Sequence, residues 1–416
     1  MNRVLAWPCV GLLVLSFTAA LPAQEWTRFR GPNGSGMGNA PTLPVKWTER
    51  DFNWKVPIPG AGVASPVLWG DKVFLASGEA KTGQRIVLCL NAADGKALWT
   101  RRFDAAPYKM HLRNSVATAT PAVDAERVYT SWATPDQYTV LALDHAGKEA
   151  WTAQLGPYKS QHGFGSSPIV YEDLLIVPND QDDGGSLIAL DKTNGKVRWQ
   201  LPRQPKNATY STPCVYQHSD SAPVLIFTNW QHGITAVEPK TGKVAWELSV
   251  FETNKQERAV ASPVVAGDLI LGTCGFVTAQ KHFVAVRPGD PQKGTKPQEV
   301  WRVEKMVSYL PSPLVKGDRV YLCTEQGIAS CLDLATGKVI WQERVPGSYA
   351  GSPVCAGEHL YCTSLDGDVL VLTMADKFET VARNALGEGT QSTPAIANGR
   401  IYFRTNGHLI AIGGPR

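Results

Sequence analysis

The sequence predicts an all-β fold, an eight-bladed β-propeller of four-stranded antiparallel blades. A Ser-Pro or Thr-Pro pair opens an apolar run eight times, at an average spacing of about 47 residues. A second motif, ending in tryptophan, recurs in phase with these pairs, and each repeat divides into four short apolar runs. Self-similarity at this period is typical of a solenoid or a propeller. The pairs begin at Ser65, Thr120, Ser167, Thr212, Ser262, Ser312, Ser352 and Thr393.

The chain begins with a segment typical of a cleavable secretory signal, which we assign to residues 1–23. Arg3 precedes an apolar run that ends at small residues around Ala23. Residues 24–50 form a lead segment, and the propeller takes residues 51–416. No later stretch has the roughly 20 continuous apolar residues that span a bilayer. We therefore expect an exported protein, periplasmic or secreted, without a transmembrane segment.

The unit that starts at Ser312 illustrates the four strands of a blade. Its sequence is "SPLVKGDRVYLCTEQGIASCLDLATGKVIWQERV". A Gly-Asp, a Gln-Gly and a Thr-Gly turn separate four short runs in which apolar residues alternate with others. Such runs, joined by tight turns, are hairpins, and four strands in series make a propeller blade.

The tryptophan motif has a mechanical interpretation. Its form is small-x-acid-x-x-x-Gly-x-x-x-Trp, as in "ALDKTNGKVRW" at residues 189–199. The acid accepts backbone N–H bonds across the turn, and the glycine adopts positive φ there. The small residue leaves room for an aromatic ring, and the tryptophan fills the wedge between blades. The predicted docking residues are Trp54, Trp99, Trp151, Trp199, Trp246, Trp301 and Trp341.

The last two units depart from the pattern. The seventh has no tryptophan, and we expect Phe378 or Val381 to fill its wedge less completely. The eighth stops after its third strand, whereas "DFNWKVPI" at residues 51–58 precedes the first repeat. This N-terminal strand is expected to complete the last blade and close the ring, which removes an exposed edge. Deleting residues 51–58 should then lower the melting temperature far more than deleting residues 26–40.

Composition excludes several classes of partner. The net charge is +4, with 41 basic and 37 acidic residues well mixed along the chain. The sequence therefore has no basic stripe for nucleic acid and no polybasic membrane patch. One ring accounts for nearly all of the chain, so we expect a monomer.

The repeats resemble those of the pyrroloquinoline-quinone-type eight-bladed propellers. This superfamily contains quinoprotein alcohol dehydrogenases and the barrel-assembly lipoprotein of the bacterial outer membrane. The resemblance covers residues 51–416. For the dehydrogenases it implies a disulfide between adjacent cysteines, a calcium held by Glu and Asn, and an Asp base. This chain has no Cys-Cys pair, and no residue can be matched to those ligands or to that base.

Other candidate chemistry is equally sparse, and we predict no catalytic and no metal-ligating residue. The eight histidines have neither HxH nor HExxH spacing. The acidic run "NDQDDGG" at residues 179–185 lacks the glutamate of a twelve-residue calcium loop, which favours a solvated hairpin turn in the third blade. Of the seven cysteines after the signal, Cys89, Cys323, Cys331 and Cys362 stand in small-residue positions, and all seven are expected to be free, packed thiols.

The candidate binding site is one mouth of the central channel. Each Ser-Pro or Thr-Pro pair opens an innermost strand, so the residues just before the pairs gather around that mouth. Their alternative role is to satisfy local backbone groups as ordinary loop residues. The candidates are His111, Arg113, Asn114, His162, Tyr210, Arg258, Tyr309 and Tyr349, joined by Phe164, Asn207 and Gln391.

Two functions are compatible with the sequence. The first is a non-catalytic scaffold that binds a protein or saccharide partner in the bacterial cell envelope, with no cofactor. The alternative is an oxidoreductase that uses pyrroloquinoline quinone with calcium at an unconventional site. The missing cysteine pair favours the scaffold.

Overall fold

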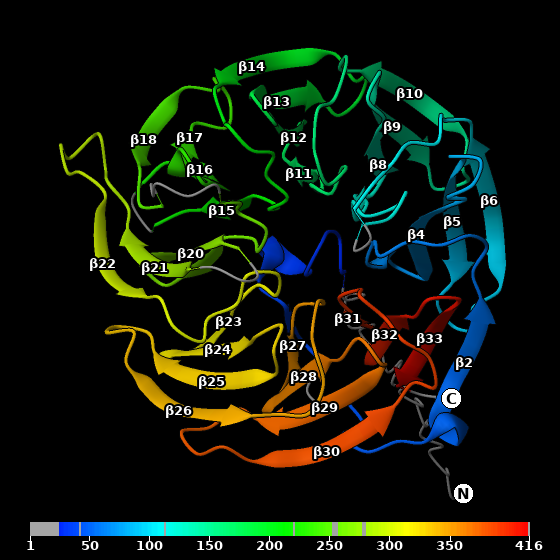
Figure 1. Ribbon diagram of the computed structural model, residues 1–416. Helices are drawn as coiled ribbons and strands as arrows, with labels where there is room; N and C mark the ends of the chain where they lie inside the picture. The colour runs from blue at the N-terminus through cyan, green and yellow to red at the C-terminus, as the bar shows by residue number, and fades with distance from the viewer. Residues whose placement is uncertain are drawn as a thin grey trace, which may run out of the picture.

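Eight antiparallel sheets stand around a central channel, and Figure 1 looks along the axis of this ring. Each blade has a short strand beside the channel and three further strands outside it. The arrangement confirms the all-β, eight-bladed fold class. The signal at residues 1–23 lies outside the part of the chain that the computed structural model describes. The described residues are 25–40, 43–111, 114–218, 221–251, 257–276 and 280–414.

Blades 1 to 7 follow one another along the chain, and each uses four consecutive strands from the channel outward. Blades 1 to 3 consist of β3 (Val67–Trp69), β4 (Lys72–Gly78), β5 (Arg85–Asn91), β6 (Ala97–Phe103); β7 (Ala122–Val123), β8 (Arg127–Ala133), β9 (Tyr138–Asp144), β10 (Glu149–Gln154); and β11 (Ile169–Tyr171), β12 (Leu174–Gln181), β13 (Gly184–Asp191), β14 (Val197–Arg203). Blades 4 and 5 consist of β15 (Cys214–Tyr216), β16 (Val224–Asn229), β17 (Gly233–Val237), β18 (Val244–Leu248); and β19 (Val264–Ala266), β20 (Leu269–Gly275), β21 (Lys281–Arg287), β22 (Gln298–Val303). Blades 6 and 7 consist of β23 (Leu314–Lys316), β24 (Arg319–Cys323), β25 (Ile328–Asp333), β26 (Val339–Arg344); and β27 (Val354–Ala356), β28 (His359–Thr363), β29 (Asp368–Thr373), β30 (Thr380–Ala385).

Blade 8 combines the two ends of the chain. Its inner strands are β31 (Ala395–Ala397), β32 (Arg400–Arg404) and β33 (His408–Gly413). The outermost strand is β2 (Phe52–Pro57), which pairs antiparallel with β33 and sets Trp54 opposite Ala411. The predicted closure by the N-terminal strand is therefore correct, and β2 covers the outer edge of β33.

The motif tryptophans lie between their own blade and the next. Trp199 pairs across the sheet with Ala189, so the small residue makes room for the indole of its own blade. The indole N–H of Trp199 donates to the Pro239 carbonyl oxygen of blade 4 at 2.6 Å, where a Cβ on Gly242 would lie 2.6 Å from the ring. The same N–H bond to the next blade is made by Trp54, Trp99, Trp151, Trp301 and Trp341. Trp246 of blade 4, which lies beside the inserted turn of blade 5, is also buried.

The wedge between blades 7 and 8 is filled from an unexpected part of the chain. Trp47, in the lead segment, lies over Tyr361 of blade 7 with ring centroids 6.5 Å apart and contacts Phe403 of blade 8. Asn384 of β30 fixes it, because its side chain accepts the Trp47 backbone N–H and donates to the Val45 carbonyl. The expectation of Phe378 in this wedge is not met, since that ring packs on Trp341 one wedge earlier. Val381, the other candidate, is half-buried and packs against the hydrophobic cluster that contains Trp47, which agrees with the expectation of incomplete filling.

The Ser-Pro and Thr-Pro pairs form a belt of hydrogen bonds around the channel. The backbone N–H of Ser262 donates to the hydroxyl of Ser312 at 2.9 Å, and the N–H of Ser312 donates to that of Ser352 at 3.0 Å. The same link joins blades 1 to 2, 2 to 3, 4 to 5 and 7 to 8. The hydroxyl is required because it accepts a buried N–H from the preceding blade.

The first part of the lead segment lies inside the ring. Residues 25–40, which we call the plug, include a 3-10 turn, η1 (Pro32–Gly34), and a short strand, β1 (Met37–Gly38), that pairs parallel with β27. Figure 1 shows η1 at the centre of the channel. A second 3-10 turn, η2 (Glu49–Asp51), precedes β2. Within the described residues, no helix has the length and apolar character needed to cross a membrane.

Candidate functional site

A cavity of about 490 Å³ occupies the mouth of the channel. The hydroxyl belt contributes part of its wall, and Phe29 of the plug reaches it from inside the ring. Of the predicted mouth residues, the structure brings five to this cavity together with Gln391. These five are His111, Asn114, His162, Tyr210 and Tyr309.

Four described candidates do not line this cavity, namely Phe164, Asn207, Arg258 and Tyr349. Tyr349 lines a neighbouring cavity of about 520 Å³ with Glu325 and Asn406. Arg258 lies behind the wall, with a side chain only 6% exposed. Arg113 lies outside the described residues.

Two histidines from neighbouring blades stack at the mouth. The rings of His111 and His162 are nearly parallel, with an interplanar angle of 9° and centroids 4.8 Å apart. The Asn114 amide donates to the carbonyls of His162 and Phe164 at 2.7 and 3.2 Å, which ties the two loops together. Burial, assisted by the charge of Arg258, lowers the pKa of His162. The imidazole is therefore held in its neutral form.

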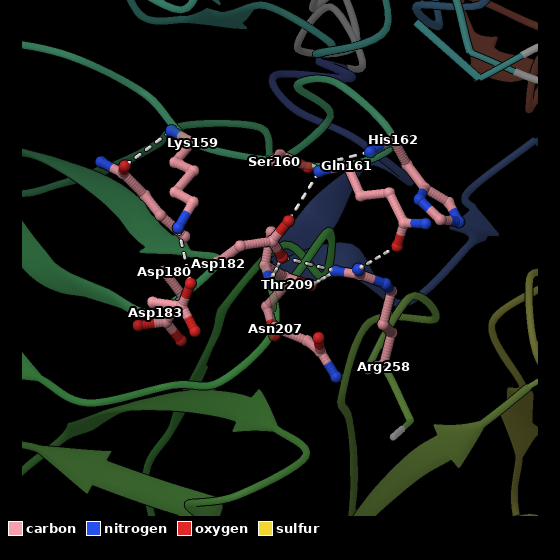
Figure 2. Close-up of polar contacts among 12 residues, drawn as sticks. Lys159, Ser160, Gln161, His162, Asp180, Asp182, Asp183, Asn207, Thr209 and Arg258 are labelled. Atoms are coloured by element: carbon pink, nitrogen blue, oxygen red, sulfur yellow. Dashed lines mark hydrogen bonds and ion pairs between the residues drawn. The ribbon is translucent and has the colours of Figure 1, made fainter. Parts of the chain in front are cut away.

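Asp182 organises the loops behind this pair, as Figure 2 shows. Its carboxylate accepts the backbone N–H groups of Gln161 at 2.6 Å and Ala208 at 2.8 Å, and it pairs with Arg258 at 3.0 Å. Burial alone would raise the pKa of Asp182, but these N–H groups and Arg258 hold it below its usual value. Loops following blades 2, 3 and 4 therefore meet on one carboxylate.

The acidic run at residues 179–185 is a hairpin turn, but only part of it is solvated. β12 and β13 join there, with Gln181 opposite Gly184. Asp180 is buried and pairs with Arg203 at 3.0 Å, whereas exposed Asp183 pairs with Lys159 at 2.6 Å. Each of the three aspartates thus has its own cationic partner. The expectation of a solvated turn holds for Asp183 and fails for Asp180.

The two tyrosines at the mouth are neutral hydrogen-bonding groups. Burial raises the pKa of both Tyr210 and Tyr309 above the ordinary phenol value. The Tyr210 hydroxyl lies 2.9 Å from the Ser160 hydroxyl. Among the described residues, no Asp, Glu, Lys or Arg side chain lines the cavity. The site therefore offers aromatic faces, hydroxyls and amides, and it suits an uncharged polar group.

This set of residues does not fit pyrroloquinoline quinone with calcium. The quinone carries several carboxylates, and calcium takes six to eight oxygen ligands that usually include Asp or Glu. The lining supplies neither a basic partner for the former nor a carboxylate for the latter within the described residues. No described group of three His, Cys, Asp or Glu residues is arranged to hold a metal ion.

A family model and several known proteins match this chain. The family model described as outer membrane protein assembly factor BamB matches residues 45–212, 86–292 and 290–413. The chain belongs to this family. A polyvinylalcohol dehydrogenase of a Pseudomonas species is 26% identical over 260 residues, which are 53% of this chain and 38% of that protein. The BamB of Pseudomonas aeruginosa is 27% identical over 147 residues, which are 35% of this chain and 38% of that protein.

Solved structures share the fold. BamB from Moraxella catarrhalis superposes with a TM-score of 0.61 at 17% identity, covering 87% of this chain and 97% of that one. The quinohemoprotein alcohol dehydrogenase from Comamonas testosteroni has a TM-score of 0.53 at 12% identity, covering 94% and 81%. At such identities the likeness describes the propeller and not its task.

Proposed function

We propose that this protein is an exported, non-catalytic propeller of the cell envelope that binds a protein or saccharide partner at its channel mouth. The observation that carries the proposal is the uncharged cavity, in which five predicted residues from four loops converge. Membership of the BamB family supports an envelope scaffold in general. The partner's identity is part of the proposal, since the matched segments span less than two fifths of the curated relatives.

The chemistry of the mouth favours an uncharged polar group of the partner. Tyr210 and Tyr309 provide aromatic faces with neutral hydroxyls. Sugar hydroxyls or peptide amides would find donors and acceptors there, whereas an ion would be desolvated without a counter-charge.

A quinone-dependent oxidoreductase is the second candidate. The relative named polyvinylalcohol dehydrogenase, matched over 53% of this chain, favours it. The channel lining opposes it, because the cavity presents no basic partner for the carboxylates of the quinone among the described residues. The scaffold therefore ranks first.

Capture from bacterial envelope extract tests the scaffold. The mature protein, immobilised, should retain a specific partner, and Tyr210→Phe with Gln391→Ala should reduce that retention at an unchanged melting temperature. Leu98→Ser, at an exposed position on the outer strand β6, is the matched control. Equal capture by the wild type and the mouth variant would contradict the proposal.

The oxidoreductase is tested separately. The purified protein is mixed with pyrroloquinoline quinone and calcium and examined for bound cofactor absorbance and for dye reduction with alcohols. Saturable binding together with turnover would replace the scaffold by the enzyme.

A further inference from the structure

The plug carries two buried arginines without an acidic partner. Arg30 is fully buried and Arg28 is 7% exposed. Arg28 donates to the Pro213 carbonyl of blade 4, and Arg30 donates to the Pro313 carbonyl of blade 6 at 2.7 Å. Neither forms an ion pair with any described residue.

Several of their N–H groups are unused. The Nε of Arg28 and both Nε and Nη1 of Arg30 are buried without a hydrogen-bond partner among the described residues. Burial lowers the pKa of Arg28 to about 10 and that of Arg30 to about 9, and the nearby charge of Arg28 contributes to the second shift. Both side chains are still cations at neutral pH, and no described carboxylate compensates either charge. A buried charge in this condition is costly.

The backbone is shaped around these two side chains. Arg30 has φ of 62°, a conformation that a residue with a Cβ rarely adopts. A Cβ on Gly36 would lie 2.7 Å from Nη2 of Arg30, and one on Gly34 would lie 3.5 Å from Nη2 of Arg28. Gly36 therefore leaves room for the guanidinium group of Arg30, whereas a Cβ on Gly34 would make only an ordinary van der Waals contact with that of Arg28.

A hydrogen-bonded contact between the plug and a blade does not by itself require a cation. Asn33, in the same segment, joins blade 4 with a neutral amide, which donates to the Val215 carbonyl and accepts the Val215 N–H, both at 2.8 Å. Elsewhere in the ring, buried Arg258 and Lys281 each face a carboxylate, at 3.0 and 2.7 Å. No described carboxylate faces the two plug arginines, so a bound anion would supply the negative charge that they lack.

We propose that a small anion, such as a halide or a small oxyanion, binds between Arg28 and Arg30 inside the channel. It would accept hydrogen bonds from the unused Nε and Nη1 groups and neutralise the paired guanidinium charges. The plug would thus be locked to blades 4 and 6 by an ion as well as by hydrogen bonds. This site is separate from the channel mouth and does not depend on the proposed function.

Thermal melting in different salts tests the site. The purified protein is melted at constant ionic strength in sodium gluconate, whose anion is too large for a buried gap, and in chloride, bromide, nitrate, formate or phosphate. A ligand that binds only the folded state raises Tm with its concentration. We expect Tm to rise by on the order of a few degrees in at least one small anion. Comparing the halide salts with the oxyanion salts shows which class of anion binds. No difference from gluconate in any of them would overturn the proposal.

Variants assign the effect to the plug. Arg30→Met and Arg28→Met should remove the dependence of Tm on the small anion. Arg404→Met should retain the dependence of Tm on the anion. Arg404 is equally buried without an acidic partner, but its Nη1 donates hydrogen bonds to the carbonyls of Ala64 and Ala76. Persistence of the anion effect in Arg30→Met would also overturn the proposal.

Crystals of the wild type supply a readout that needs no variant. After a bromide soak, an anomalous peak should appear in contact with both guanidinium groups. Data of sufficient quality without that peak, together with a flat halide series, would exclude a halide. With a flat oxyanion series as well, the site would be rejected.

Discussion

At the scale of single residues, the motif glycine of each blade packs directly against the motif tryptophan of the preceding blade. A Cβ on Gly95, Gly147, Gly195, Gly242 or Gly337 would lie 2.5–2.8 Å from the indole of the preceding blade. The glycine is needed for positive φ, as the sequence suggests, and also for this close approach. Only the first reason is visible without the structure, because the second depends on how neighbouring blades dock.

Gly242→Ala separates the two reasons when it is compared with Gly267→Ala. Both positions have positive φ, at 71° and 61°, but nothing lies within 4 Å of a Cβ on Gly267. A left-handed alanine costs roughly 1–2 kcal/mol at either site, and overpacking against Trp199 should add about 1–3 kcal/mol for Gly242→Ala. Denaturant unfolding measures the difference. Equal losses would mean that the indole moves away without cost.

His162, in the stacked pair, makes a contribution to stability that depends on pH. The pKa of His162 in the folded protein lies below its ordinary value of 6.5. The unfolded chain therefore binds more protons in this window, so stability is fully present above 6.5 and is lost as pH falls through the folded pKa. Between about pH 8 and about pH 5, Tm should fall more for the wild type than for His162→Gln. Parallel curves for the two proteins would refute the assignment.

At the scale of elements, the belt explains why the recurring pair begins with a hydroxyl residue. The Ser312 hydroxyl accepts the buried N–H of Ser262 in the preceding blade at 2.9 Å. Proline then leads into the inner strand, since it has no N–H to satisfy. The sequence shows the pair as a repeat marker, whereas its partner in the neighbouring blade appears only when the ring is assembled.

Ser312→Ala should therefore cost about 1–3 kcal/mol, because it leaves a buried N–H without an acceptor. Ser312→Thr keeps the hydroxyl and should lose much less, as Thr120, Thr212 and Thr393 occupy the same position in other blades. Urea unfolding of the two variants makes the comparison. If alanine and threonine are equally tolerated, the belt does not stabilise the ring.

Periodicity determines which elements were predictable. The strands, the closure by β2 and five of the eight mouth residues follow from repeats, because each repeat obeys the same local rules. Trp47 and the plug occur once, and their contacts join residues some 180 to 340 positions apart, such as Asn33 with Val215 and Trp47 with Asn384. A string rich in glycine and arginine, "RFRGPNGSG", was the available signal. Nothing in it specifies the blades that it contacts.

At the scale of the whole molecule, the plug connects five blades around the ring, including blades that are not neighbours. Its backbone pairs with Leu68 of blade 1 and with Cys355 of blade 7, and Thr27 accepts the N–H of Val123 in blade 2. Asn33 and Arg30 reach blades 4 and 6. A ring closed only at its rim can open at one wedge, whereas a central segment resists separation of several blades at once.

Progressive N-terminal truncation tests this arrangement. A chain that starts at residue 43 loses the plug, one that starts at 51 also loses Trp47, and one that starts at 59 also loses β2. The sequence alone predicts that loss of β2 lowers Tm far more than loss of the plug. The structure predicts a fall of Tm at each step. The first truncation removes fully buried Trp26 and Arg30 from the channel, and the second removes Trp47 from its contact with Tyr361. The third exposes the edge of β33. Calorimetry of the three chains against the mature protein gives the result. If the chain that starts at residue 43 has the same Tm as the longest chain, the plug does not stabilise the ring.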